Sequence, residues 1–241
     1  MQTLSYTLCM NQAVHLPKKV TQVSKTGKSK PPARAPSRTN DPERTMAGIL
    51  EVATVEFGEK GLDGARIDEI AAATKTSKRM IYYYFGSKEG LYRAVLEDIY
   101  RRMRAIESGL HLADLPPVEA LKKLVGFTFD HHHDNESFIR LVMSENMQRG
   151  AYLSQSKSIQ GLNVPAIAAI RELYERGVAT GVFRTGLDPV DIHASISALT
   201  FFNVSNQHTF GLIFSQDPTS PEAIATRRKN IIDMVLRFML A

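Results

Sequence analysis

The sequence predicts an all-α protein with a small N-terminal three-helix domain of the helix-turn-helix type and a larger C-terminal helical domain. Apolar residues recur at helical spacing along most of residues 41–241, and no stretch alternates apolar and polar side chains as a half-buried strand does. Two short helical segments close together predict the helix-turn-helix. We expect the two domains to cover residues 41–100 and 101–241.

Residues 1–40 differ in composition from the rest of the chain. They hold seven Lys and Arg and no Asp or Glu, so the net charge of +5 leaves −2 for residues 41–241. This stretch is rich in Lys, Ser, Thr and Pro, and we expect a disordered basic arm. Its Cys9 is the single cysteine of the chain, which excludes an intramolecular disulfide and favours a cytoplasmic location.

The first helix is expected to begin at Asp41-Pro42-Glu43. Asp is a favoured cap, Pro suits the first helical position, and Glu is favourable near the positive end of the helix dipole. Glycines at 58 and 61 are expected to end this helix. Its apolar positions are Met46, Ile49, Leu50, Ala53 and Phe57.

The helix-turn-helix is predicted from residues 67–84. A short segment with Ile67 and Ile70 is followed by the polar break at residues 74–77, and a second short segment begins with Lys78 and Arg79. The second helix of such a motif fits the DNA major groove. Residues 74–88 contain four cationic side chains and no acidic one, as a phosphate-contacting surface requires.

A fourth helix is expected after Ser87, which suits a cap. Its apolar positions are Leu91, Val95, Ile99 and Met103. The basic run Arg101, Arg102 and Arg104 is expected to form a solvated face of this helix.

The C-terminal half is also expected to be helical. Apolar stripes predict helices around residues 121–129, 138–145 and 167–178, and Asp188-Pro189 and Ser220-Pro221 predict two more helix starts. Residues 192–216 contain no Asp, Glu, Lys or Arg but are too polar to span a membrane, so we expect a helix buried against other helices. No membrane association is expected.

Residues 42–99 resemble the DNA-binding domain of the TetR family of transcriptional regulators. The resemblance is carried by Ile67-Asp68-Glu69-Ile70-Ala71, Ser77-Lys78, Ile81-Tyr82-Tyr83-Tyr84-Phe85 and Ser87-Lys88-Glu89. It implies a homodimer whose residues 77–84 enter the major groove. The DNA-contacting residues that it implies are Arg66, Thr76, Ser77, Lys78, Arg79, Met80, Tyr82, Tyr83 and Lys88.

Three positions in this region depart from the family pattern or allow two interpretations. Arg79 stands where a small residue is common, and it either reads a guanine bidentately or contacts a phosphate. Lys75 stands where Gly or Asn is usual in the turn, which predicts some backbone strain. Arg66 replaces the usual Thr cap.

Of the three consecutive tyrosines, at least one is expected to join Phe85 in the core, because consecutive helical residues point in different directions.

The C-terminal half resembles the family only in its plan, which implies a ligand pocket and a dimer interface within one set of helices. Residues 192–216 and 224–240 suit the two interface helices. Residues of these types at helical spacing more often belong to the hydrophobic core than to a ligand pocket. With that alternative open, the candidate effector contacts are Phe127, His131, Phe138, Met143, Met147, Tyr174, Phe202 and His208.

The run His131-His132-His133 suggests a metal site, but consecutive helical residues point about 100° apart and cannot all face one ion. We therefore expect a polar helix end, with no metal and no cofactor. The predicted function is that of a DNA-binding regulator, a repressor released from its operator by a small-molecule effector. The expected partners are double-stranded DNA, a second copy of the chain and an unidentified effector. A metal-dependent hydrolase and a regulator controlled by a partner protein remain as alternatives.

Overall fold

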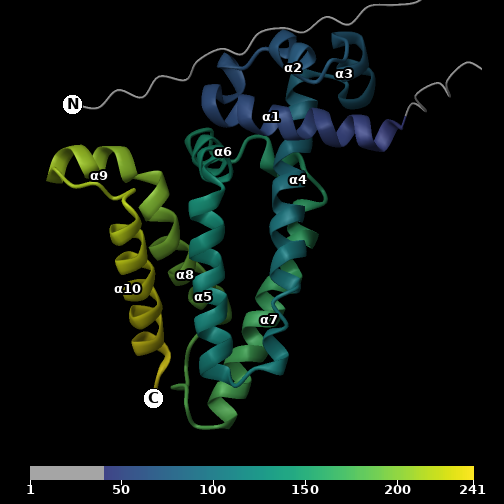
Figure 1. Cartoon of the computed structure of the whole chain (residues 1–241). Coiled ribbons are helices and arrows are strands. Elements are labelled where there is room, and N and C mark those ends of the chain that lie inside the picture. The colour runs from purple at the N-terminus through teal and green to yellow at the C-terminus, as the bar shows by residue number, and fades with distance from the viewer. Residues whose placement is uncertain (1–40) are drawn as a thin grey trace, which may run out of the picture. The chain divides into compact units, whose positions relative to one another are not determined.

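The computed structural model describes residues 41–241, which are helical throughout and contain no strand (Figure 1). The predicted basic arm lies outside the described residues. Phe183 and Leu240 form an isolated antiparallel bridge. The helices are α1 (Pro42–Gly64), α2 (Ile67–Ala73), α3 (Lys78–Phe85), α4 (Lys88–Ser108), η1 (Leu112–Asp114), α5 (Pro117–Asp134), α6 (Glu136–Met147), η2 (Leu153–Gln155), α7 (Ile159–Ala179), α8 (Pro189–Ser205), α9 (Gln207–Phe214) and α10 (Pro221–Met239).

Side-chain caps set the predicted helix starts. Asp41, Ser87, Asp188 and Ser220 each accept a hydrogen bond from a backbone N–H in the first turn of α1, α4, α8 and α10. Each bond satisfies a donor that the helix itself leaves unpaired. The four starts predicted from these residues are therefore confirmed.

The regular part of the first helix ends at Gly61, as predicted, whereas the prediction that Gly58 also ends it is wrong. The helix continues to Gly64, with a break in the backbone at Gly61, where φ is +67° and ψ is 177°. Gly58 lies inside the helix and is buried against α6, where a Cβ atom would come within 3.1 Å of the Ser137 Cβ. Close packing, and not chain reversal, therefore accounts for this glycine.

One hydrophobic core joins α1–α4 to α6. Buried side chains of α1, α2 and α4 surround Ile81 of α3 and continue to Phe138, Ile139 and Leu141 of α6. Helix α4 runs without interruption through residue 100, the expected boundary between the two domains. The described residues form one compact unit, in which α1 and α4 join the helix-turn-helix to the C-terminal helices.

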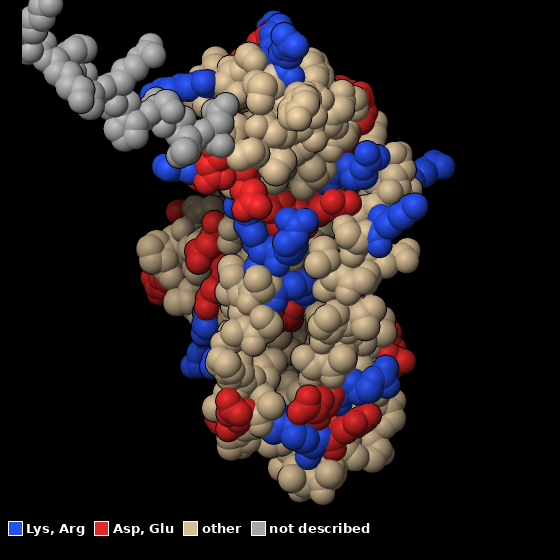
Figure 2. All heavy atoms as spheres, turned by 90° about the vertical axis from the view of Figure 1, so that its right-hand side faces the viewer, with Lys and Arg blue, Asp and Glu red and all other residues tan. Residues whose placement is uncertain are grey.

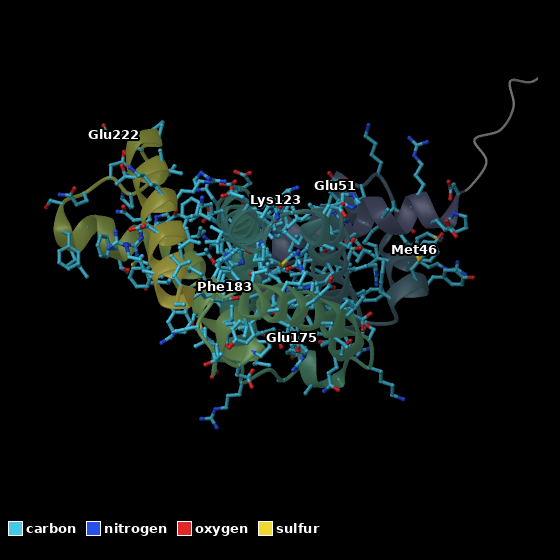
Figure 3. All side chains as sticks on the ribbon, turned by 90° about the horizontal axis from the view of Figure 1, so that it is seen from below. Met46, Glu51, Lys123, Glu175, Phe183 and Glu222 are labelled. Carbon is cyan, nitrogen blue, oxygen red and sulfur yellow. The ribbon has the colours of Figure 1, made fainter. Side chains whose placement is uncertain are left out.

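A second core lies among α5, α7, α8 and α10. Phe183, on the loop after α7, is 2% exposed and lies beside α7 and α10 (Figure 3). Its ring fits because residue 177 has no side chain, since a Cβ there would lie 1.9 Å from the Phe183 Cδ2. Backbone hydrogen bonds from Arg184 to Met239 and from Ala241 to Val182 fix the end of the chain nearby.

The prediction of one buried helix over residues 192–216 is wrong for its second half. The segment forms two helices, α8 and α9, joined at Asn206. Whereas α8 buries Ile192, Ile196 and Val204, α9 buries no residue and leaves Leu212 83% exposed. An uncharged segment is expected to pack against another apolar surface, but its sequence does not show whether that surface belongs to the same chain.

Among the described residues, no helix combines the length and the hydropathy that crossing a bilayer would require.

Candidate nucleic-acid interface and internal cavity

Helix α3 is anchored by one face and exposes the other. Ile81 is fully buried, and Tyr84 and Phe85 pack against the same core. Lys78 and Arg79 are exposed, and Tyr82 and Tyr83 are 43% and 78% exposed. Positions 78 and 82, like 79 and 83, are four apart, so the cations and tyrosine rings share one outer face. This confirms the expectation that part of the tyrosine run belongs to the core.

The turn before α3 has the strained backbone that was predicted. Lys75 has a φ of +53°, in the left-handed region that a residue with a side chain seldom occupies. Ser77 caps α3, its hydroxyl accepting from the Met80 N–H at 3.2 Å. Thr76 and Met80 are half-buried, so they lie at the edge of the exposed face.

Several cations of this region already have partners within the chain. Lys78 forms an ion pair with Asp68 of α2, and the Lys88 Nζ donates to the Asp63 carbonyl at 3.2 Å. Arg66 uses its backbone N–H to reach the Glu56 carboxylate at 3.0 Å, and its exposed side chain makes no cap on α2. Exposed ion pairs contribute little energy, so a phosphate can replace Asp68 at low cost.

Gly90 positions α3, and the sequence reasoning did not identify it. A Cβ at this position would lie 2.0 Å from the Phe85 carbonyl oxygen, which is backbone and cannot rotate away. The end of α3 therefore sits directly on the first turn of α4. The signal was present as a glycine inside a helical pattern, where glycine is unfavourable unless packing requires it.

Figure 2 shows the side of the molecule on which α4 and α7 lie. Lys and Arg side chains run along its middle, with acidic side chains beside them. A cavity of about 630 Å³ opens between the C-terminal half of α4, the loop with η1, and α7. Its size is that of a site for a small organic molecule. Arg104, Glu107, Leu162, Ala166, Glu172 and Arg176 are among the residues that line it.

The basic run of α4 is not uniformly solvated. Arg101 and Arg102 are exposed and pair with Asp98, as a solvated face would. Arg104, whose side chain is 11% exposed, instead turns inward to Glu107, and the prediction is wrong for this residue. Helix geometry places position 104 about 60° from position 101 but about 160° from position 102. Position 104 therefore lies on the side of α4 that packs against α7, which buries it.

The histidine run is likewise not a polar helix end. His132 is 3% exposed, and its ring stacks on Phe138 with centroids 5.8 Å apart. Burial lowers the pKa of His132 to about 4, and His131 and His193 beside it contribute to this shift. His133 alone of the three is exposed. A tight turn between α5 and α6 folds the run back onto the core, which the sequence does not reveal.

The candidate effector contacts do not form one site. His131 lies against Phe127 and Phe138, with ring centroids 5.8 Å and 5.5 Å away. Met143, Met147 and His208 border a shallow hollow between α1, α6 and α8, where Met147 is 83% exposed. The Tyr174 hydroxyl donates to the Arg184 carbonyl and accepts from the Leu187 N–H. Phe202 borders a smaller cavity near α9, and none of the eight lines the 630 Å³ cavity.

Among residues 41–241, no three His, Cys, Asp or Glu side chains are gathered as they would be around a metal ion.

A helix-turn-helix with an outward basic and tyrosine-bearing second helix, packed on a helical domain that encloses a cavity, defines a DNA-binding regulator of transcription. The chain belongs to the TetR family. Residues 49–95 match the model described as "Bacterial regulatory proteins, tetR family", and residues 117–235 match "Tetracyclin repressor-like, C-terminal domain".

Known repressors and a solved structure are similar to large parts of the chain. The chain is 34% identical over 200 residues to the HTH-type transcriptional repressor NicS of Pseudomonas putida, covering 83% of this chain and 94% of that protein. It is 37% identical to the HTH-type transcriptional repressor SCO4008 of Streptomyces coelicolor, covering 58% and 70%. The solved structure of SCO4942 from Streptomyces coelicolor superposes with a TM-score of 0.60 at 26% identity, covering 81% of this chain and 98% of that one.

Proposed function

We propose that this TetR-family regulator is a cytoplasmic repressor, with no enzymatic activity, that binds operator DNA as a homodimer and leaves it when a small molecule occupies the C-terminal helices. The observation that carries the proposal is the outer face of α3. Lys78, Arg79, Tyr82 and Tyr83 project from a helix whose opposite side is anchored by Ile81. A rigidly held helix with these side chains suits the major groove. The names of the relatives NicS and SCO4008 support repression.

Dimerisation is supported by the apolar surface of the last three helices. Large apolar side chains of α8, α9 and α10 remain exposed in the single chain, and burying such a surface favours association. A symmetric pair presents two copies of α3, whose half-sites lie about 34–36 Å apart when they occupy successive turns of one DNA face. The exposed apolar residues are Val190, Phe202, Phe210, Leu212, Ile213, Phe214, Met234 and Phe238.

Control by an effector is supported by the cavity beside α4. The same helix packs its N-terminal half against α1 and α3, so a ligand that moves α4 also moves the recognition helix. An effector lowers operator affinity by the factor by which it prefers the non-binding conformation.

The test begins with selection of bound fragments from genomic DNA by the purified full-length protein, followed by gel shifts at several salt concentrations. We expect selective, salt-sensitive binding of a palindromic site by a dimer. The double variant Lys78→Ala/Arg79→Ala should lose this binding, whereas Arg171→Ala, on the exposed side of α7, should keep it. Binding that is unaffected by the double variant, or a monomer on the operator, would contradict the proposal.

A further inference from the structure

Arg104 is a cation enclosed within the C-terminal helices. Its side chain is 11% exposed, and that of its ion-pair partner Glu107 is 10% exposed. The Arg104 Nε also donates to the Asn163 side-chain oxygen of α7 at 3.0 Å. Burying an arginine and a glutamate together costs several kcal/mol of lost hydration, and the pair rarely returns more than that. The pair is therefore weak evidence that Arg104 stabilises the fold, and we consider a role for Arg104 in ligand binding instead.

Both members of this pair border the 630 Å³ cavity. The other two arginines of the cavity wall have partners that do not compete with a ligand in the same way. Arg101 pairs with Asp98, and Arg176 donates to the carbonyls of Leu112, Ala113 and Leu115. Arg104 differs from them because its carboxylate partner also faces the cavity. A carboxylate entering the cavity can thus compete with Glu107 for the same guanidinium.

Three imidazoles lie close to Arg104, on α5 and α8. Burial lowers the pKa of His131, His132 and His193, and the positive charge of Arg104 lowers all three further. Within the described residues, the Nδ1 atoms of His131 and His132 are buried and have no hydrogen-bond partner. Three imidazole rings therefore lie near Arg104, and Glu107 is its ion-pair partner, while Asp114 and Glu172 are further carboxylates of the cavity wall.

We propose that the cavity between α4 and α7 binds a small organic carboxylate, and that the ligand's carboxylate takes the place of Glu107 on the Arg104 guanidinium. The inference rests on the proposed function, since it names the chemical class of the effector. A planar guanidinium matches a carboxylate through two parallel hydrogen bonds, which gives both affinity and orientation. The displaced Glu107 returns to water through the open side of the cavity.

The exchange also suggests how binding is transmitted. Arg104 and Glu107 lie three residues apart on α4, one turn of helix. Because Arg104 also donates to Asn163 of α7, a ligand held by its guanidinium acts on the contact between α4 and α7. The N-terminal turns of α4 carry Leu91 and Tyr92 in the core beneath α3. The effector thus acts on the element that supports the recognition helix.

The binding test compares acids with their own amides, which match them in shape but carry no charge. The probes are benzoate and benzamide, phenylacetate and phenylacetamide, and hexanoate and hexanamide. Thermal stabilisation of the full-length protein is measured first, and calorimetry then gives Kd. We expect at least one acid to bind about tenfold or more tightly than its amide. Failure of all three acids to bind, or equal binding of acid and amide, would overturn the inference.

Two variants isolate the exchange. Glu107→Gln removes the competing carboxylate while keeping its shape, so acid binding should tighten about tenfold and amide binding should not change. Arg104→Gln in the Glu107→Gln background leaves no buried charge unpaired, and it should abolish the preference for the acid. Weaker or unchanged acid binding by Glu107→Gln contradicts the inference, provided that its melting temperature shows a folded protein.

Operator binding is measured separately, so that the two proposals can fail independently. Loss of selective DNA binding would refute the repressor while leaving the calorimetric preference for acids intact. An acid that binds at Arg104 but does not release the operator would retain the site and refute its role as an effector site. Release by acids, accompanied by the Glu107→Gln gain, supports both.

Discussion

The Arg140 guanidinium on α6 donates from its Nε to the carbonyl oxygen of Gly58 on α1 at 2.7 Å, and its Nη2 reaches the Glu59 carbonyl at 3.1 Å. These carbonyls precede the break at Gly61, where the regular helix leaves them without its own donors. One side chain of the C-terminal domain therefore completes the end of the first helix of the DNA-binding domain, 82 residues earlier in the chain.

Replacing Arg140 with Met should destabilise the protein by about 1–3 kcal/mol, because two carbonyls lose a charged donor. Urea unfolding at one fixed protein concentration measures the loss. Glu136→Gln keeps the carbonyl contacts of Arg140 and removes the exposed pairing of Glu136 with Arg140 and His208, so it should change stability by less than about 1 kcal/mol. Equal effects of the two variants would mean that the carbonyl contacts add nothing.

Arg79→Ala should weaken operator binding by about 1–3 kcal/mol and relax selectivity at one base pair, because Arg79 is exposed on the outer face of α3. Gel shifts on the operator and on single-base variants measure both quantities. Lys88→Ala is the comparison, and should weaken all sequences alike and lower the salt slope by about one. If Arg79→Ala behaves like Lys88→Ala, then Arg79 contacts phosphate.

Gly90→Ala should reduce operator affinity by about tenfold or more and lower stability by about 1–3 kcal/mol, because the new Cβ meets the Phe85 carbonyl and shifts the end of α3. Gly48→Ala in α1 is the matched control. Nothing lies within 4 Å of a Cβ there, so the change should stabilise the helix by up to about 1 kcal/mol. Full operator affinity in Gly90→Ala would show that this contact does not position α3.

Stability should fall with acidification between about pH 6.5 and pH 4, and His132 is the main cause. Burial lowers the pKa of His132 from 6.5 to about 4 in the folded chain. Between these two values the imidazole is protonated in the unfolded chain and neutral in the folded chain. The contribution of neutral His132 to the free energy of unfolding is therefore fully present above pH 6.5. Protonation of His132 alone should lower that free energy by about 2 kcal/mol between pH 8 and pH 5. The lowered pKa values of His131 and His193 act in the same direction.

Urea unfolding at a series of pH values measures this dependence. His132→Leu keeps an apolar side chain in the core but cannot titrate, so most of the slope should disappear. His133→Asn, at an exposed position, should leave the slope unchanged. A wild-type protein equally stable at pH 8 and pH 5 would show that His132 accepts a proton readily in the fold.

Local features were predictable where one or two neighbouring residues decide them. Caps at Asp41, Ser87, Asp188 and Ser220 depend on a side chain reaching its own first turn, and all four form. Helical spacing predicts that part of the tyrosine run joins the core, whereas the outward-facing residues of α3 were implied by the family resemblance. The burial of Arg104 and His132 was not predictable, because each depends on helices that are 30 or more residues away in the chain.

Short-range periodicity and capping predict a helical chain with a helix-turn-helix, because both features depend on residues that are neighbours in the sequence. The folded chain alone shows that α4 continues from the helix-turn-helix to a cavity, that Arg104 and Glu107 border that cavity, and that α9 stays uncovered. Those outcomes depend on which helices meet, and burial free energy is summed over contacts between distant segments.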